Sequence, residues 1–268
     1  MSVNRKDTTP RGLATTPLWC HDSPTANRLS VAWLRPYGRV MESLAVTPNL
    51  TMQRVKGWQV YVWRDGDSAT LIDTGAPGSG ADIEAAVPGI DRIVLTHGHV
   101  DHVGSAAELR RSTAATVMAG AGDSAVIRGE TDMPPPIFED WEIPIYERVT
   151  AGLPRSAPAV PVDRELNDGD VLDFGGGAHV LAIPGHTEGS IAIHLPAHGV
   201  LFTGDTIANV GTVMLGTFNH DRARTIASFK RLAALDVDTA CFGHGEPIVS
   251  AAGDKLRAAA AAYDDDHG

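Results

Sequence analysis

The chain has 268 residues, of which 43% are hydrophobic and 21% are charged, which is typical of one globular domain spanning residues 1–268. Its formal net charge of −11, without any cluster of Lys and Arg, argues against a nucleic-acid partner, because such proteins bind by neutralising phosphates. We expect a cytoplasmic protein with no membrane partner, because the sequence shows no bilayer-length apolar run, no signal peptide and only two cysteines, Cys20 and Cys241.

The first part of the chain predicts strands followed by a helix. Residues 1–27 are polar and contain prolines, which indicates a loose N-terminal arm. Residues 58–63 (WQVYVW) and 69–72 predict two strands joined by a polar turn. Residues 90–95 (IDRIVL) predict a buried strand that leads into a histidine-rich loop, and the spacing of apolar residues over 103–111 predicts a helix.

Residues 133–161 differ from the rest of the chain because they contain seven prolines. They also carry three large apolar side chains, Trp141, Ile145 and Tyr146. Long irregular segments inside a domain are often functional, so we interpret this one as a lid insertion. Trp141 and Tyr146 are then candidate substrate contacts, although they are equally suited to anchor the insertion to the domain.

The second half of the chain predicts further strands that alternate with helices. Asp221 is a suitable N-cap for an amphipathic helix over 222–235. The other predicted elements are strands at 178–183, 190–195, 200–202 and 239–242 and a closing alanine-rich helix at 251–263. Alternating strands and helices place the protein in the α/β class.

The segment Thr96-His97-Gly98-His99-Val100-Asp101-His102 places four potential metal ligands directly after a predicted strand. Imidazole nitrogens and carboxylate oxygens suit zinc and similar divalent ions. A histidine-rich surface loop is the simpler interpretation of this segment alone. However, His186, Asp205 and His244 each follow another predicted strand and lie next to a glycine, so coincidence at all four places is improbable.

These motifs, in this order, resemble those of the metallo-β-lactamase superfamily. The resemblance includes Leu71-Ile72-Asp73-Thr74-Gly75 and extends from residue 71 to residue 245. It implies an αββα sandwich, in which two facing mixed sheets have helices outside and bind metal at one edge.

The resemblance also implies two metal sites that share one carboxylate. The ligands would be His97, His99 and His186 for one ion, Asp101, His102 and His244 for the other, and Asp205 as a bridge beside a hydroxide. Asp73 would steady the metal-binding loop. Zinc is the default ion for a nitrogen-rich ligand set, and Mn²⁺ or Fe²⁺ are alternatives.

Such a centre predicts a hydrolase of a small carboxylic ester, lactone or thioester that uses a metal-bridging hydroxide. Asp101 would act as both ligand and proton carrier. His220 precedes the 222–235 helix and is a candidate substrate contact, although a solvated histidine is the favoured interpretation. Ala208 occupies the place where acyl-homoserine lactonases have a tyrosine, so a lactone substrate would lack that donor.

Three alternatives remain open at this point. An iron-dependent oxidoreductase of the persulfide dioxygenase type shares the Gly-His-Thr context of His186, but it needs only the first metal site. A β-lactam hydrolase is less favoured, because position 205 is Asp where the zinc enzymes that use a cysteine ligand have Cys. A silent binding module would be expected to lack a ligand, and none is missing.

Overall fold

The strand β3 (Trp58–Asp65) shows how the sequence builds a layered fold, because its central residues are buried and alternate between two cores. Val60 and Val62 belong to one core, whereas Tyr61 and Trp63 belong to another. Successive side chains of a strand point to opposite faces of its sheet. Both faces of the sheet that contains β3 are therefore covered.

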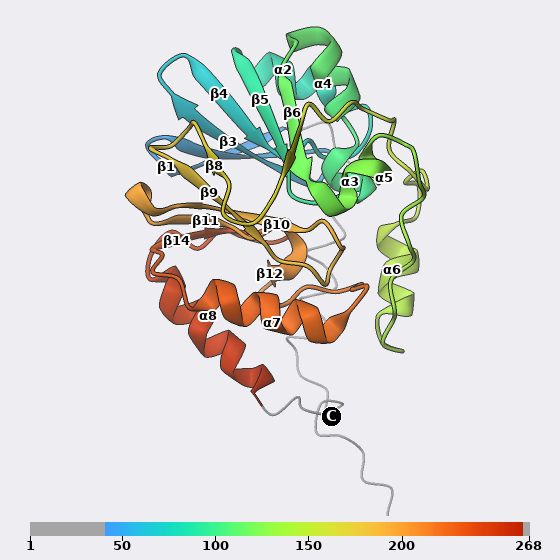
Figure 1. Cartoon of the computed structure of the whole chain (residues 1–268), viewed down its shortest axis with the longest axis vertical. Helices are drawn as coiled ribbons and strands as arrows, with labels where there is room; N and C mark the ends of the chain where they lie inside the picture. Colours follow the sequence, from blue (N-terminus) through green and yellow to red (C-terminus); the bar gives the residue numbers. More distant parts are fainter. Residues whose placement is uncertain (1–40, 265–268) are drawn as a thin grey trace, which may run out of the picture. The chain divides into compact units, whose positions relative to one another are not determined.

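Two sheets face each other in the computed structural model, which describes residues 41–264 (Figure 1). The first sheet has seven strands in sequence order. They are β1 (Glu42–Thr47), β2 (Leu50–Val55), β3, β4 (Ser68–Ile72), β5 (Ile90–Leu95), β6 (Thr116–Gly120) and β7 (Arg164–Leu166). The predicted arm over 1–27 and Cys20 lie outside the described residues.

The second sheet has five strands in the order β14-β11-β10-β9-β8. These strands are β8 (Val171–Leu172), β9 (Ala178–Ala182), β10 (Ile191–Leu195), β11 (Val200–Phe202) and β14 (Thr239–Cys241). A separate two-stranded ribbon consists of β12 (Ile207–Asn209) and β13 (Val213–Leu215). Apolar residues from both large sheets, Cys241 among them, form the core between the two layers.

Helices cover the outer faces of both sheets (Figure 1). The first sheet is covered by α2 (Gly80–Ala86), α3 (Val100–Val103), α4 (Ala106–Thr113) and α5 (Ser124–Ile127). The second sheet is covered by α7 (Arg222–Ala233) and α8 (Ala252–Ala260). The predicted αββα sandwich is therefore confirmed. Among residues 41–264 there is no helix with the length and apolar character needed to cross a membrane.

The predicted helix over 103–111 is interrupted, because α3 ends at Val103 and α4 begins at Ala106. Gly104 lies between the two helices and packs so closely against Pro77 that a Cβ would lie 2.4 Å from the proline ring. The hydroxyl of Ser105 donates a hydrogen bond to the carbonyl of Ala76. Contacts with the segment after β4 thus redirect the chain at this point.

The predicted insertion over 133–161 contains a helix that the sequence reasoning did not predict, α6 (Ile143–Val149). Pro144 lies in its first turn, where a missing N–H costs nothing and the fixed φ favours helix. The carboxylate of Glu142, just before the helix, accepts hydrogen bonds from the backbone N–H groups of Glu139 and Phe218. The insertion is therefore attached to the loop that precedes α7.

Candidate metal centre

The strand directions bring the sequence motifs to one edge of the sandwich. In the first sheet β4 and β5 are parallel, so Asp73, which follows β4, lies beside the histidine-rich loop that follows β5. In the second sheet β10 is antiparallel to both β9 and β11, and β14 is parallel to β11, so β9, β11 and β14 share one direction. The segments that carry His186, Asp205 and His244 therefore emerge at the same edge.

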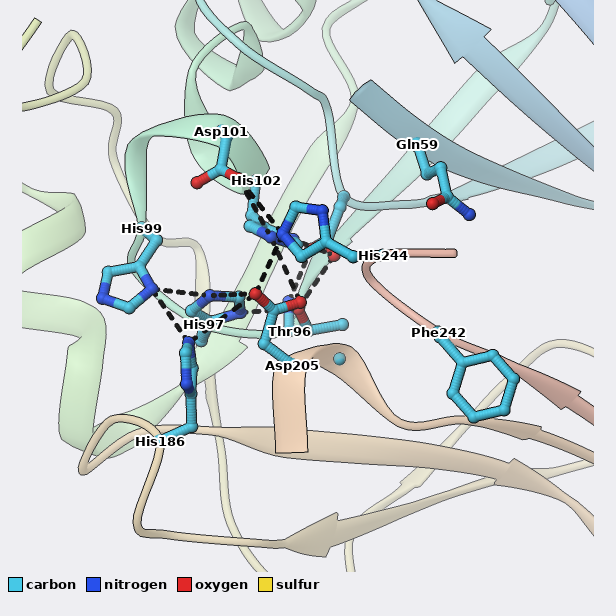
Figure 2. Close-up of polar contacts among 12 residues, drawn as sticks. Gln59, Thr96, His97, His99, Asp101, His102, His186, Asp205, Phe242 and His244 are labelled. Carbon is cyan, nitrogen blue, oxygen red and sulfur yellow. Dashed lines mark hydrogen bonds and ion pairs between the residues drawn. The ribbon is translucent and has the colours of Figure 1, made fainter. Parts of the chain in front are cut away.

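Three histidines from two of these segments form a tight cluster (Figure 2). Nδ1 of His99 lies 3.0 Å from Nε2 of His97 and 3.0 Å from Nε2 of His186. Zinc–nitrogen bonds of about 2.0–2.1 Å in a tetrahedron place ligand nitrogens roughly 3.3–3.4 Å apart. The three nitrogens thus converge at nearly the spacing that a zinc ion imposes.

Asp101, His102 and His244 form a second cluster beside the first (Figure 2). Oδ2 of Asp101 lies 3.6 Å from Nε2 of His102 and 3.3 Å from Nε2 of His244. Asp205 lies between the clusters, with Oδ2 3.7 Å from Nε2 of His186 and 3.1 Å from Nε2 of His244. The structure therefore brings together all seven residues that the motifs predict as ligands.

The donor atoms of this cluster fit a divalent metal ion. Nε2 of His102 and Oδ1 of Asp205 are buried and lie 3.4 Å apart, and neither has a well-formed hydrogen bond to a residue within 41–264. Buried polar atoms are normally hydrogen-bonded, and a shared external partner is the usual explanation when they are not. Because these atoms face one another among nitrogen and carboxylate donors, the cluster is a divalent metal site.

The electrostatics of the first cluster keep its histidines neutral, which is the form that binds metal. Burial lowers the pKa of His99 to about 4. Burial also lowers the pKa of His186 to about 3, with repulsion from His99 adding to the effect. The pKa of His97 is well below its ordinary value because of burial and of repulsion from His102.

The second cluster behaves differently because it contains carboxylates. Burial opposes the charged form of His244, but Asp205 and Asp101 outweigh it and raise the pKa of His244 to about 9. Burial likewise opposes the charged form of His102, and Asp205 and Asp101, joined by Asp73, raise its pKa well above the ordinary value. Burial would raise the pKa of Asp101, but His102 and His244 hold it at about 2.

Asp73 lies behind the second cluster and contacts its ligand-bearing loop directly. Its Oδ2 accepts hydrogen bonds from Nδ1 of His102 and from the hydroxyl of Thr96, each at 2.8 Å. Its Oδ1 accepts the backbone N–H of Thr96 at 2.8 Å. Because Nδ1 of His102 is engaged by a carboxylate, Nε2 is the nitrogen left to bind a metal.

Asp123 has an equivalent position behind the first cluster, and the sequence reasoning missed it. Its buried carboxylate accepts hydrogen bonds from the N–H of Gly98 at 2.8 Å, the hydroxyl of Thr187 at 2.6 Å and the N–H of Gly189 at 2.7 Å. It therefore ties the loop of His97 and His99 to the loop of His186. A sequence signal existed, because a Gly-Asp pair follows β6 as Asp73 follows β4.

His220 lies beside the first cluster, and its environment differs from that of a solvated histidine. Its ring centroid is 6.1 Å from that of His99, and its backbone N–H donates to the carbonyl of His186. Nε2 is buried and forms no hydrogen bond to any described residue. The pKa of His220 is lowered by partial burial, although the backbone of Pro134 and the charge of Asp123 act in the opposite direction.

The three apolar residues of the insertion differ in their surroundings. Tyr146 stacks edge-on against Phe138 at 4.8 Å and Phe218 at 5.2 Å between ring centroids, so it attaches α6 to the loop before α7. Trp141 is 50% exposed. Ile145 is half-buried on α6.

Comparisons with protein families and curated proteins agree with this geometry. The family model for the Metallo-beta-lactamase superfamily matches residues 54–244. The hydroxyacylglutathione hydrolase of Cereibacter sphaeroides is 32% identical over 157 residues, which are 58% of this chain and 48% of that protein. The hydroxyacylglutathione hydrolase of Rhodobacter capsulatus is 29% identical over 189 residues, which are 69% of this chain and 60% of that protein. The chain spans about half the length of the curated relatives it matches.

Solved structures resemble this fold over most of its length. A subclass B3 metallo-beta-lactamase of Bradyrhizobium japonicum has a TM-score of 0.63 and 23% identity, covering 87% of this chain and 94% of that one. A metallo-beta-lactamase family protein of Thermus thermophilus has a TM-score of 0.57 and 22% identity, covering 83% of this chain and 80% of that one. These structures establish the same fold.

Proposed function

This chain belongs to the metallo-β-lactamase superfamily, and from that premise we propose that it is a dinuclear metal-dependent hydrolase of a small carboxylic ester, lactone or thioester. The observation that carries the proposal is the pair of ligand clusters that share Asp205. The proposed ligands are those that the motifs predict. Their placement supports two ions, because each cluster supplies three donors of its own.

We propose Zn²⁺ at both sites, because five of the seven donors are imidazoles, and Mn²⁺ or Fe²⁺ would also accept this ligand set. A pair of such ions, when bound, lowers the pKa of a shared water toward neutrality and polarises the carbonyl that is attacked. The protein then needs no serine or cysteine nucleophile. In this respect Cys241 is unsuited to catalysis, since burial raises the pKa of its thiol well above the usual range.

Asp101 is the residue that we propose to move the proton. Its carboxylate lies 3.3 Å from Nε2 of His244, and its side chain is 15% exposed. Hydrolysis adds the oxygen of water to the carbonyl carbon and breaks the bond to the leaving oxygen or sulfur. Asp101 would accept the proton that the water loses and deliver it to the leaving group.

The substrate proposal combines the substrate named for the relatives with the apolar side chains of the insertion. The curated relatives are named as hydrolases of hydroxyacylglutathione, which is a thioester. Thioesters therefore come first among the three proposed substrate classes. The insertion adds exposed apolar side chains, Ile137, Trp141 and Ile143, which suit a moderately hydrophobic acyl group. In this proposal residues 133–161 act as a lid, and Trp141 and Tyr146 contribute to binding the substrate or to anchoring the lid.

We propose His220 as a substrate contact. The ring of His220 forms a hydrogen bond with the backbone of Pro134. Its buried Nε2 lies beside His99 and stays available for a substrate. In the neutral ring this nitrogen accepts a hydrogen bond, so it suits a substrate with an O–H or N–H group near the scissile bond. The insertion therefore contributes to the site through Pro134 as well as through its apolar residues.

The partner, the cellular location and the domain organisation of the protein are also proposed. A small molecule is the proposed partner, and a cytoplasmic location is proposed from the two cysteines in 268 residues, of which Cys241 is free and buried. The single-domain organisation over 1–268 likewise remains a proposal.

The test combines elemental analysis with a substrate panel on the purified protein. We expect about two divalent ions per chain and the highest kcat/KM on a thioester, ester or lactone rather than on a β-lactam or a phosphodiester. A single iron without a second metal would overturn the dinuclear centre. A β-lactam or phosphodiester as the best substrate would overturn the carboxylic-ester proposal while leaving the metal centre intact.

A further inference from the structure

The side chain of Gln59 holds the peptide backbone next to the metal ligand His244. Its Nε2 donates to the carbonyl of Gly245 at 2.7 Å, and its Oε1 accepts the N–H of Gly245 at 2.7 Å. Gln59 lies on β3 in the first sheet, whereas Gly245 follows β14 in the second sheet. One buried amide therefore bridges the two layers next to His244.

Tyr61 holds the same segment from its other end. Its Oη donates to the carbonyl of Phe242 at 2.9 Å and receives the N–H of Phe242 at 3.2 Å. Tyr61 and Gln59 are two positions apart on β3, so their side chains point to the same face. Together they bind the backbone on both sides of His244.

Backbone bonds hold the segment beyond the end of β14 at Cys241 on one side, and the side chains of β3 hold it on the other. The N–H of Gly243 donates to the carbonyl of Gly204, the carbonyl of His244 accepts the N–H of Asn209, and Asn209 forms an isolated parallel bridge with Gly245. Gln59 and Tyr61 add the contacts that come from the first sheet. Gly245 adopts φ +98°, and a Cβ there would lie 2.0 Å from the carbonyl oxygen of Asn209, so the chain has little freedom to shift. The position of the His244 ring relative to Asp101 and Asp205 follows from this backbone.

We infer that Gln59 is a positioning residue for the metal site formed by Asp101, His102 and His244, and that it acts on His244 through Gly245. The inference rests on the proposed dinuclear centre. Gln59 is not a ligand, because both polar atoms of its amide are engaged by Gly245.

The effect of Gln59 is confined to one of the two sites. The loops of His97, His99 and His186 are held by Asp123, whose carboxylate accepts its hydrogen bonds from Gly98, Thr187 and Gly189. Removal of the Gln59 amide therefore weakens the binding of one ion and leaves the other unchanged. A general loss of stability would weaken both.

Gln53 provides a matched control. It is also a glutamine that is 7% exposed, it lies on the neighbouring strand β2, and its Nε2 donates to Ser43 on β1. The variants Gln59→Leu and Gln53→Leu thus remove the same buried amide from the same sheet. Only the first removes contacts to the segment that carries His244.

The experiment titrates metal-free protein with Zn²⁺ in competition with a chromophoric chelator. We expect Gln59→Leu to bind one ion as the parent does and the other about 10- to 100-fold more weakly, the range typical for residues that orient metal ligands. Gln53→Leu should bind both ions like the parent. Equal weakening of both ions in Gln59→Leu, or two unchanged affinities, would overturn the inference.

Tyr61→Phe is a second variant that keeps the buried ring and removes the hydroxyl bound to Phe242. It should weaken the same single ion, by less than Gln59→Leu does. If Gln59→Leu fails to fold, the Zn²⁺ affinities of Tyr61→Phe provide the test. Two unchanged affinities would then reject the inference that side chains of β3 position His244. A parent protein that binds only one ion would overturn both the dinuclear centre and this inference. If the parent binds two ions, the variants test the role of Gln59 separately from the dinuclear centre.

Discussion

The carboxylate of Asp73 accepts a hydrogen bond from Nδ1 of His102 at 2.8 Å, while the backbone of Asp73 itself adopts the left-handed region with a φ of 64°. Non-glycine residues adopt this region at an energetic cost, and such residues concentrate at functional sites. The next residue, Thr74, binds the carbonyl of His102 through both its N–H and its hydroxyl. The ring and the backbone of this ligand are therefore both fixed by the turn after β4.

We expect Asp73→Asn to weaken the binding of the ion at His102 by about 10- to 100-fold, because an amide cannot replace the carboxylate that accepts three hydrogen bonds. The measurement is the metal content of protein equilibrated at a fixed concentration of free Zn²⁺. Asp91→Asn, an exposed position on β5, is the control and should retain both ions. Full retention in Asp73→Asn would show that the carboxylate does not orient His102.

Asp101→Asn is expected to lower kcat by about 10²- to 10⁴-fold, the usual contribution of a proton-transferring side chain. KM should change little, because the substrate is positioned by other groups. The first cluster does not include Asp101, so at least one ion should remain bound. Steady-state kinetics with parallel metal analysis separate the effects, and an unchanged kcat would remove Asp101 from the proposed mechanism.

Metal binding at the second cluster should release protons and depend on pH. Before metal binds, His102 and His244 are protonated near neutrality, because the pKa of His244 is about 9 and that of His102 is also raised. Both must lose a proton to become ligands, so affinity rises as pH increases toward about 9. The histidines of the first cluster are already neutral, so their ion should bind almost independently of pH near neutrality.

Calorimetry in buffers of different ionisation enthalpy checks this asymmetry. We expect about two protons to be released with one ion and almost none with the other. Equal proton release with both ions would contradict the charge distribution described for the two clusters.

Chelation should lower the melting temperature, because an ion that binds only the folded state stabilises it. At a free concentration of 100 times Kd, each ion contributes about 2.7 kcal/mol, which corresponds to roughly 5–10 °C for a domain of this size. Differential scanning calorimetry before and after confirmed metal removal measures the shift. An unchanged melting temperature would mean that the ions do not bind the folded state in preference to the unfolded one.

Trp141→Ala and Tyr146→Ala should separate the two roles proposed for the insertion. Tyr146→Ala removes the ring contacts with Phe138 and Phe218, so we expect unfolding to become easier by about 1–3 kcal/mol. Trp141→Ala alters an exposed side chain, so stability should change by less than about 0.5 kcal/mol. If the lid contacts substrate, Trp141→Ala should still reduce kcat/KM for the more apolar acyl groups. Parent-like kinetics in both variants would reject the lid.

The sequence predicted the fold and the site best where a functional residue directly follows a buried strand. The ligands each follow a buried strand and a glycine-rich turn, and parallel strand directions then place those turns at one edge. Short apolar runs such as 90–95 and 200–202 became strands at the predicted residues. Asp221 also caps α7 as predicted, by accepting the N–H of Arg224.

The residues that the sequence did not reveal act on parts of the chain that are distant in sequence. Gln59 lies in an apolar strand and gives no signal of its own, because its partner Gly245 is 186 residues away. Asp123 follows β6 in a Gly-Asp pair, but its partners Thr187 and Gly189 are 64 and 66 residues away, so its role depends on contacts that are distant in sequence. The break at Gly104 has the same origin, since Pro77 comes from another turn. Local periodicity contains no information about such neighbours.

The centre draws its donors from both layers of the sandwich, and this has a consequence for the order of folding. His99 and His186 are 87 residues apart in sequence, so their contact closes a long loop and carries a corresponding entropic cost. Contacts of this kind form late relative to hairpins such as β2–β3. High-affinity metal uptake during refolding would therefore report the docking of one sheet onto the other, and a zinc-sensitive dye could time that event without any label on the protein.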